Sequence, residues 1–232
     1  MTRAVVCSLA FVLLPLLAAC GAPSNVVPAS ESASSTTTKK GPGTWGDLWK
    51  DAPIEAGKSE RPVVRFVTDL GVVTVELARR KAPATVSNFL TYAKSGFYDG
   101  TRLHRVEAGV RIDGGRFDAA GKERPTRGPI RNEADNGLLN VRGTIAMARK
   151  AEPHSATAAW YFNLVDQPTL DFHGTSRPED WGHCVFGKVA DTESLAVLEK
   201  IAGIPVETDT LTGRPTAPKT PFLVKAVEVV AE

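Results

Sequence analysis

The pattern of apolar and polar positions predicts a strand-rich domain. Two β-branched runs, Val63 to Thr68 and Val72 to Leu77, flank the turn-forming stretch 69–71 and predict a β-hairpin. Further strand-like runs cover residues 101–117, 143–148, 160–165, 184–189 and 222–230, and residues 121–139 have the composition of a long loop. Many short strands of this kind predict a mainly β fold, a closed or nearly closed antiparallel barrel.

Two segments have the periodicity of an amphipathic helix instead. Pro83 opens a helix that runs to about Lys94 and places apolar residues at helical spacing on one face. A second helix is expected over about residues 192–202, with Leu195, Leu198 and Ile201 facing inward. We therefore expect two α-helices that cap the barrel.

The first twenty residues differ in kind from the rest. Arg3 precedes an apolar run over residues 4–18, which is shorter than the roughly 20 residues of a membrane-spanning helix. The run ends at LAACG, residues 17–21, which resembles the lipobox of bacterial lipoproteins. We expect residues 1–19 to be a signal peptide and Cys20 to be lipidated with acyl chains such as palmitate. An ordinary secretory signal beside a cysteine is the alternative.

A low-complexity segment follows the predicted lipidation site. Residues 21–44 are rich in Ser, Thr, Pro, Ala and Gly, a composition that cannot bury a core. We assign residues 20–60 as a tether and 61–232 as the folded domain, anchored to a membrane on the extracytoplasmic side of the cell envelope. Within the tether, Trp45 and Trp49 are expected to pack on the domain, with a partner-binding patch as the alternative.

Composition excludes several classes of function. The net charge of +2 and the lack of a dense basic block give no reason to expect nucleic-acid binding. The four histidines lack metal-ligand spacing, and no glycine fingerprint for a nucleotide is present. We expect a monomer without metal or cofactor. Cys184, in an apolar run, is expected to be a small core residue.

A motif in the first half of the domain indicates its family. The stretch FYDGTRLHRV at residues 97–106, followed by GGRF at 114–117, resembles the catalytic segment of the cyclophilins, the peptidyl-prolyl cis-trans isomerases. The stretches NEADNGL at 132–138, RGTIAMAR at 142–149 and VFGKV at 185–189 are also similar to bacterial cyclophilins. The resemblance extends from about residue 63 to residue 230 and implies the same barrel fold.

The resemblance also implies which residues form the site. Arg105 matches the arginine that carries the family's chemistry, although a plain surface arginine on a strand is the alternative. Ala148 matches the small residue that floors the substrate groove, and Leu170 and His183 match residues of the proline pocket. A plain structural role is the alternative for His183. The reaction needs no nucleophile, because a guanidinium directed at the prolyl nitrogen stabilises the twisted transition state.

Several positions depart from the family pattern. Val110, Arg111 and Asp113 stand where the family has a phenylalanine, a methionine and a glutamine, and Tyr161 replaces a pocket phenylalanine. We expect Val110 and Tyr161 to shape the pocket and Asp113 to replace the peptide-binding amide. Asp113 could pair with Arg105, which would hold the guanidinium away from the prolyl nitrogen, or with Arg111, which would leave it free.

Two functions are therefore open at this point. The first is a membrane-tethered peptidyl-prolyl isomerase that assists protein folding outside the cytoplasm by acting on proline-containing peptides or unfolded clients. The second is a cyclophilin-fold module of the cell envelope that has lost catalysis and binds a peptide or protein partner.

Overall fold

The computed structural model describes residues 57–210 and 212–232. The predicted signal peptide, Cys20 and the tether with its two tryptophans lie outside the described residues, apart from residues 57–60. The strands of the main sheet are β1 (Val63–Thr68), β2 (Gly71–Leu77), β3 (Thr101–Leu103), β4 (Arg105–Glu107), β5 (Arg111–Gly114), β6 (Thr144–Met147), β7 (Trp160–Asn163), β8 (Val185–Val189) and β11 (Phe222–Ala231).

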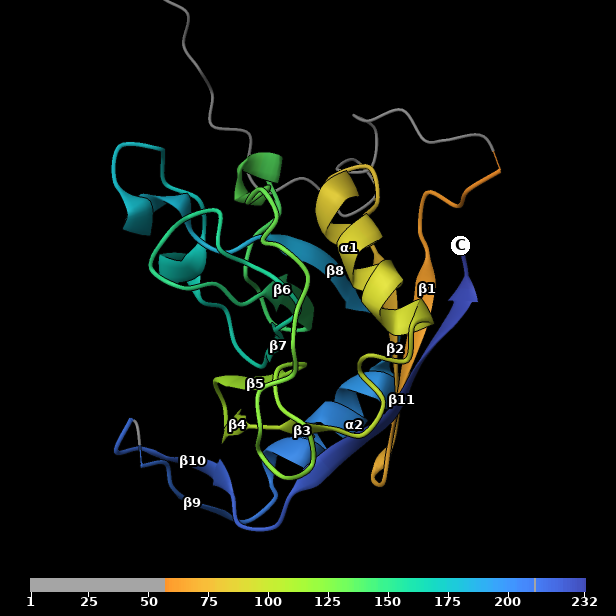
Figure 1. Ribbon diagram of the computed structural model, residues 1–232, viewed down its shortest axis with the longest axis vertical. Coiled ribbons are helices and arrows are strands. Elements are labelled where there is room, and N and C mark those ends of the chain that lie inside the picture. The colour runs from red at the N-terminus through yellow and green to blue at the C-terminus, as the bar shows by residue number, and fades with distance from the viewer. Residues whose placement is uncertain (1–56, 211) are drawn as a thin grey trace, which may run out of the picture. The chain divides into compact units, whose positions relative to one another are not determined.

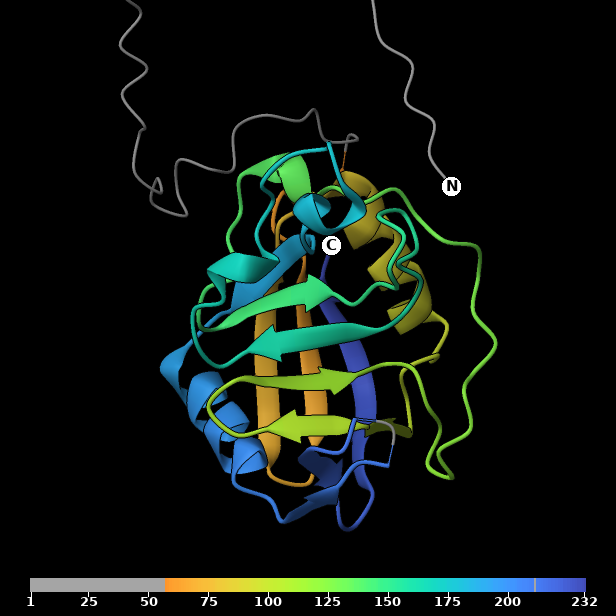
Figure 2. The same ribbon diagram turned by 90° about the vertical axis from the view of Figure 1, so that its left-hand side faces the viewer.

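These strands form one antiparallel sheet in the order β3-β11-β1-β2-β8-β6-β7-β5-β4. Figure 2 shows its two halves: strands β6, β7, β5 and β4 run across the front, and β2, β1 and β11 run steeply behind them. The two edge strands, β3 and β4, follow each other directly in the chain, so the sheet curls back on itself. The predicted mainly β, nearly closed barrel is confirmed.

Aromatic residues fill the space between the two halves of the sheet. The ring of Phe66 on β1 packs edge-on against Trp160 and Phe162 on β7, at centroid separations of 4.9 Å and 5.3 Å. All three are buried, because alternate residues of each strand point inward. Cys184 is also buried, as predicted, and this burial raises the pKa of its thiol to about 12.

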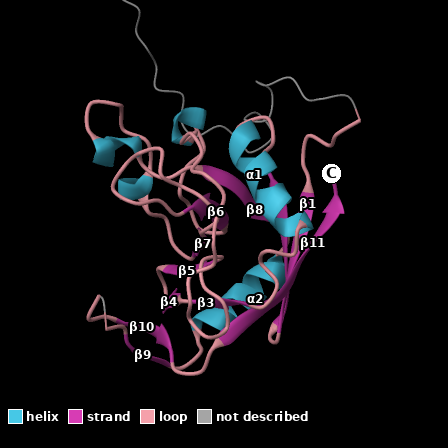
Figure 3. Cartoon of the chain, viewed as in Figure 1, coloured by secondary structure: helices cyan, strands magenta, loops and turns pink. Residues whose placement is uncertain are grey.

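Two α-helices cover the barrel, as expected (Figures 1 and 3). Helix α1 (Pro83–Lys94) begins at a proline whose fixed φ suits the first turn, and it buries Phe89 against Tyr98 with ring centroids 5.1 Å apart. Helix α2 (Thr192–Ala202) is capped by Asp191, whose carboxylate accepts from Ser194 N at 2.7 Å. In the described part of the chain, no helix has the length and apolar character needed to span a membrane.

The loops contain short elements that the apolar pattern did not predict. A second, two-stranded sheet pairs β9 (Val206–Thr208) with β10 (Pro215–Pro218) and lies beside β4. The 3₁₀ turns are η2 (Ala134–Asn136), η3 (Pro168–Leu170) and η4 (Pro178–Trp181). The β9–β10 hairpin has few buried side chains, so its sequence lacks the alternation by which a strand is predicted.

Candidate active site

The β4–β5 hairpin places four charged side chains on one face of the barrel wall. Val106 and Ile112 point into the core, so the residues on either side of them point outward. The register pairs Arg105 with Asp113 and Glu107 with Arg111 across the hairpin. Two arginines and two carboxylates therefore share a small surface.

In this cluster, the closest ion pairs join residues of the same strand, and the contact across the hairpin is longer. Arg105 Nη2 contacts a carboxylate oxygen of Glu107, and Arg111 Nε lies 3.1 Å from Asp113 Oδ2. Arg105 Nε is 4.0 Å from that same oxygen, which is too long for a hydrogen bond. Of the two alternatives left by the sequence, Asp113 therefore pairs with Arg111. The Arg105 side chain remains 23% exposed.

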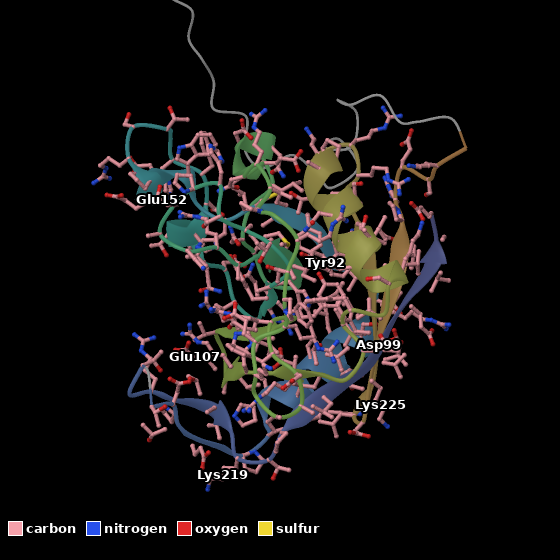
Figure 4. The ribbon with its side chains drawn as sticks, viewed as in Figure 1. Tyr92, Asp99, Glu107, Glu152, Lys219 and Lys225 are labelled. Carbon is pink, nitrogen blue, oxygen red and sulfur yellow. The ribbon has the colours of Figure 1, made fainter. Side chains whose placement is uncertain are left out.

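Sequence reasoning missed Glu107. Its carboxylate contacts Arg105 on one side, and its Oε1 lies 3.3 Å from Nη1 of Arg214 in the β9–β10 hairpin. Figure 4 shows Glu107 beside this hairpin. An acidic residue two positions after an arginine in a strand lies on the same face, which is the signal that could have revealed it. The contact with Arg214, 107 residues away, has no signal in the sequence.

Burial changes the proton affinity of Asp113. Loss of solvent raises the pKa of this carboxyl to about 6, although the charges of Arg111 and Arg105 act in the opposite direction. Oδ2 has no well-directed hydrogen bond, because the 3.1 Å contact with Arg111 is poorly aligned. The role of Asp113 in place of the peptide-binding amide stays a prediction.

The expected pocket residues meet around Tyr161 on β7. The Tyr161 hydroxyl donates to Asn140 Oδ1 at 2.9 Å, and its ring packs edge-on against His183 with centroids 5.6 Å apart. Leu170 packs against the same buried cluster. The Arg111 guanidinium lies over the ring, 4.9 Å from its centroid. The structure therefore brings together three of the predicted pocket residues and adds Arg111 to them.

His183 is held in a fixed orientation. Its Nδ1 lies 3.1 Å from the main-chain oxygen of Met147, and burial lowers the pKa of the imidazole to about 4. His183 is therefore neutral near pH 7. It can serve as an uncharged wall of the pocket while it ties β6 to the segment before β8.

The two other predicted residues, Val110 and Ala148, lie in different surroundings. Val110 is half-buried in the β4–β5 turn, where its carbonyl accepts from Leu164 N at 2.9 Å. Ala148 packs against the Tyr161 cluster and also lines a neighbouring hollow of about 60 Å³. The hollow is bordered by Gly115, Arg116, Glu123, Thr126, Arg149, Lys150, Thr157 and Ala159.

Comparison with known proteins agrees with this arrangement. A nearly closed barrel with an arginine beside an aromatic pocket is the architecture of the cyclophilin class. Residues 63–228 match the model of the family described as cyclophilin type peptidyl-prolyl cis-trans isomerase/CLD. The chain belongs to this family, and it is a peptidyl-prolyl cis-trans isomerase by class.

Curated relatives and solved structures support the assignment. Peptidyl-prolyl cis-trans isomerase B of Escherichia coli K12 is 47% identical over 142 residues, covering 61% of this chain and 85% of that protein. The isomerase cyp18 of Streptomyces antibioticus is 41% identical over 72% of this chain and 98% of its own length. A Cryptosporidium parvum cyclophilin, crystallised in the presence of the dipeptide Ala-Pro, has the same fold, with a TM-score of 0.58 at 22% identity, covering 73% of this chain and 99% of that one.

Proposed function

We propose that this chain accelerates the cis-trans isomerisation of X-Pro bonds through Arg105, and that it does so outside the cytoplasm, tethered to a membrane by a lipidated Cys20. The uncatalysed rotation faces a barrier of about 18–20 kcal/mol, because amide resonance is lost in the twisted state. The prolyl nitrogen becomes a hydrogen-bond acceptor only in that state. A guanidinium directed at it therefore stabilises the transition state more than the planar ground state.

The observation that carries this proposal is the position of Arg105. Arg105 is paired with Asp113, and Asp113 with Tyr161, across strands β4, β5 and β7. The Arg105 side chain is partly exposed and is not sequestered by the buried Asp113, whose nearer partner is Arg111. Glu107 engages Nη2 of Arg105 and Nε is buried, which leaves Nη1 as the nitrogen that can donate to a substrate. An apolar wall for the pyrrolidine ring is supplied by Tyr161 and Leu170.

The isomerase proposal is tested by the cis-to-trans rate of short X-Pro peptides with the full chain in mild detergent. We expect the wild type to accelerate isomerisation and Arg105→Ala to be at least about tenfold slower. A tenfold change in rate corresponds to about 1.4 kcal/mol in the activation barrier. Arg105→Lys should recover little, because an ammonium lacks the planar fork. The matched control is Arg65→Ala, which removes an exposed arginine from β1 that pairs with Glu228 at 3.0 Å.

The proposed location depends on the sequence around Cys20. The apolar run, the lipobox-like LAACG and the tether that follows support lipidation of a secreted chain. In cells fed radiolabelled palmitate, the wild-type chain should carry label and fractionate with membranes, and Cys20→Ala should do neither. Equal labelling of the two chains would contradict the tether without affecting the isomerase proposal.

The proposed partners are proline-containing segments of clients that fold near the membrane surface, and the proposed working form is a monomer. A second candidate, a binding module without catalysis, is favoured by one observation: the Tyr161 ring is covered by Arg111. If the folded chain accelerates no X-Pro peptide, the binding module becomes the better proposal.

A further inference from the structure

The ring that should hold the substrate proline is closed to solvent. Tyr161 is 0% exposed, although it stands at the position of a pocket phenylalanine in the family pattern. A pyrrolidine ring can pack on Tyr161 only after some group that now covers the ring has moved. Which group can move is decided by how each neighbour is held.

The apolar neighbours of the ring belong to the buried cluster of Ala78, Leu138, Ala146 and Val185, and two of its three polar neighbours are anchored to the barrel. His183 contacts the main-chain oxygen of Met147 at 3.1 Å, and Asn140, which accepts from the Tyr161 hydroxyl, donates to Asp171 Oδ1 at 3.1 Å and to Leu170 O at 3.0 Å. Moving either of them would break buried hydrogen bonds, each of which is costly to leave unmade.

The third polar neighbour, Arg111, is held less firmly. Its guanidinium carbon lies 4.9 Å from the centroid of the Tyr161 ring, and its contact with Asp113 is a single poorly aligned ion pair. The side chain is long and 19% exposed, so it can rotate into solvent without movement of the β5 backbone. A cation over an aromatic ring is attracted to it, so the covered arrangement is favoured in the free protein.

We propose that Arg111 is a lid over the proline pocket, and that it makes acidic side chains beside the proline the preferred neighbours in the substrate. This inference rests on the proposed isomerase function of the same site. In the free enzyme Arg111 covers Tyr161. When a peptide binds, the guanidinium leaves the ring, and a carboxylate of the peptide can take the place of the ring as its partner.

The charges around the pocket favour such a carboxylate. Arg149, the other arginine whose charge acts on His183, donates its hydrogen bonds to main-chain oxygens of the described chain, those of Gly182, Lys150, Ala151 and Pro178. Two of the nearby carboxylates already have cationic partners, and Asp171 accepts hydrogen bonds from Asn140. Glu107 pairs with Arg105 and Arg214, and Glu123 pairs with Arg116. A substrate carboxylate therefore approaches a face whose own acidic groups already have partners within the protein.

The test compares the wild type with Arg111→Met and Arg111→Lys. Rates are measured on peptides with Glu next to the proline, before or after it, against peptides with Gln at the same place. Wild type should favour Glu over Gln by several-fold at low salt, less at high salt. Arg111→Met should accelerate isomerisation of the Gln peptides by roughly three- to thirtyfold, which is the rate change that corresponds to the energy of one cation–π contact. The same substitution should abolish the preference for Glu.

An NMR titration that measures binding of the dipeptide Ala-Pro tests the lid independently of catalysis. Tighter binding by Arg111→Met supports the lid even if no variant accelerates isomerisation. If the wild type is active and Arg111→Met changes neither binding nor rates, the lid is wrong and the isomerase proposal stands. Slower turnover in Arg111→Met, with the fold intact by circular dichroism, also overturns the lid.

The other variants complete the comparison. Arg111→Lys should retain a preference for Glu, because the charge remains, and loss of that preference would count against the proposal. The matched control is Arg142→Ala, which removes an exposed arginine that pairs with Glu199 at 2.9 Å, away from this cluster. It should leave both the rates and the preference for Glu unchanged.

Discussion

Arg111 Nε lies 3.1 Å from Asp113 Oδ2, whereas Arg105 Nε lies 4.0 Å from the same oxygen. The buried carboxylate is therefore nearer to Arg111, whereas Arg105 contacts Glu107. The two arginines therefore have different surroundings: the Arg111 guanidinium lies over the Tyr161 ring, and the Arg105 side chain remains 23% exposed.

Glu107 should orient Arg105 for the reaction. Replacing it in Glu107→Gln keeps the shape of the side chain and removes its charge, so the guanidinium is held less firmly. We expect kcat to fall about two- to fivefold with little change in KM, the scale of a partly exposed ion pair. Arg214→Ala, which acts only through Glu107, should have a smaller effect of the same sign.

The measurement for Glu107 is steady-state isomerase kinetics. Glu207→Gln is the matched control, since it removes an exposed carboxylate from β9. An equal loss in Glu207→Gln, or a rise in KM alone in Glu107→Gln, would show that Glu107 does not position Arg105.

The titration of Asp113 should make stability depend on pH. Its pKa in the folded protein, about 6, lies above the ordinary value of 3.8, so the folded state holds a proton that the unfolded chain releases. The contribution of Asp113 to the unfolding free energy should therefore decrease as pH rises from about 4 to 6, by roughly 2–3 kcal/mol in all. Asp113→Asn should lack this decrease.

Urea unfolding of wild type and Asp113→Asn at pH 4, 5, 6 and 7 measures the difference directly. Asp69→Asn, at an exposed position in the β1–β2 turn, is the comparison for a carboxyl that stays in solvent. Parallel stability curves for wild type and Asp113→Asn would mean that Asp113 does not change its proton affinity on folding.

The Tyr161 hydroxyl should serve stability more than catalysis. Tyr161→Phe removes the donor to Asn140 Oδ1, which would keep only a longer contact with Asn163 Nδ2 at 3.3 Å. We expect a loss of about 1–2 kcal/mol in unfolding free energy, with isomerase activity largely retained because the ring remains. Thermal unfolding and peptide kinetics on the same preparation test this, and a large loss of activity at unchanged stability would contradict it.

Gly115 should be intolerant of any side chain. Its φ is +76°, and a Cβ there would lie 2.5 Å from Trp160 Nε1 and 2.8 Å from Trp160 Cδ1. Gly115→Ala combines a left-handed backbone with overpacking against a buried ring, so we expect a loss of more than about 2 kcal/mol in unfolding free energy. Gly128→Ala, where a Cβ meets nothing within 4 Å, is the control and should be close to neutral in the same unfolding experiment.

Local features of the sequence were sufficient for much of the fold. Both α-helices have the predicted bounds, because a proline at the first turn and an apolar stripe act within a few residues of each other. The β1–β2 hairpin follows from β-branched runs around a glycine turn. The family motif carries the prediction for Arg105, and the sequence alone carries the prediction for Cys20.

The tertiary structure decided the partners within the site. Arg111 and Tyr161 lie on paired strands but are 50 positions apart in the chain, and Glu107 meets Arg214 from a hairpin that the apolar pattern did not predict. Whether Asp113 pairs with one arginine or the other depends on differences of about an ångström between side chains packed in a region with little water. Such distances are set by the register and packing of the whole barrel, whereas the bounds of a helix depend only on residues a few positions apart.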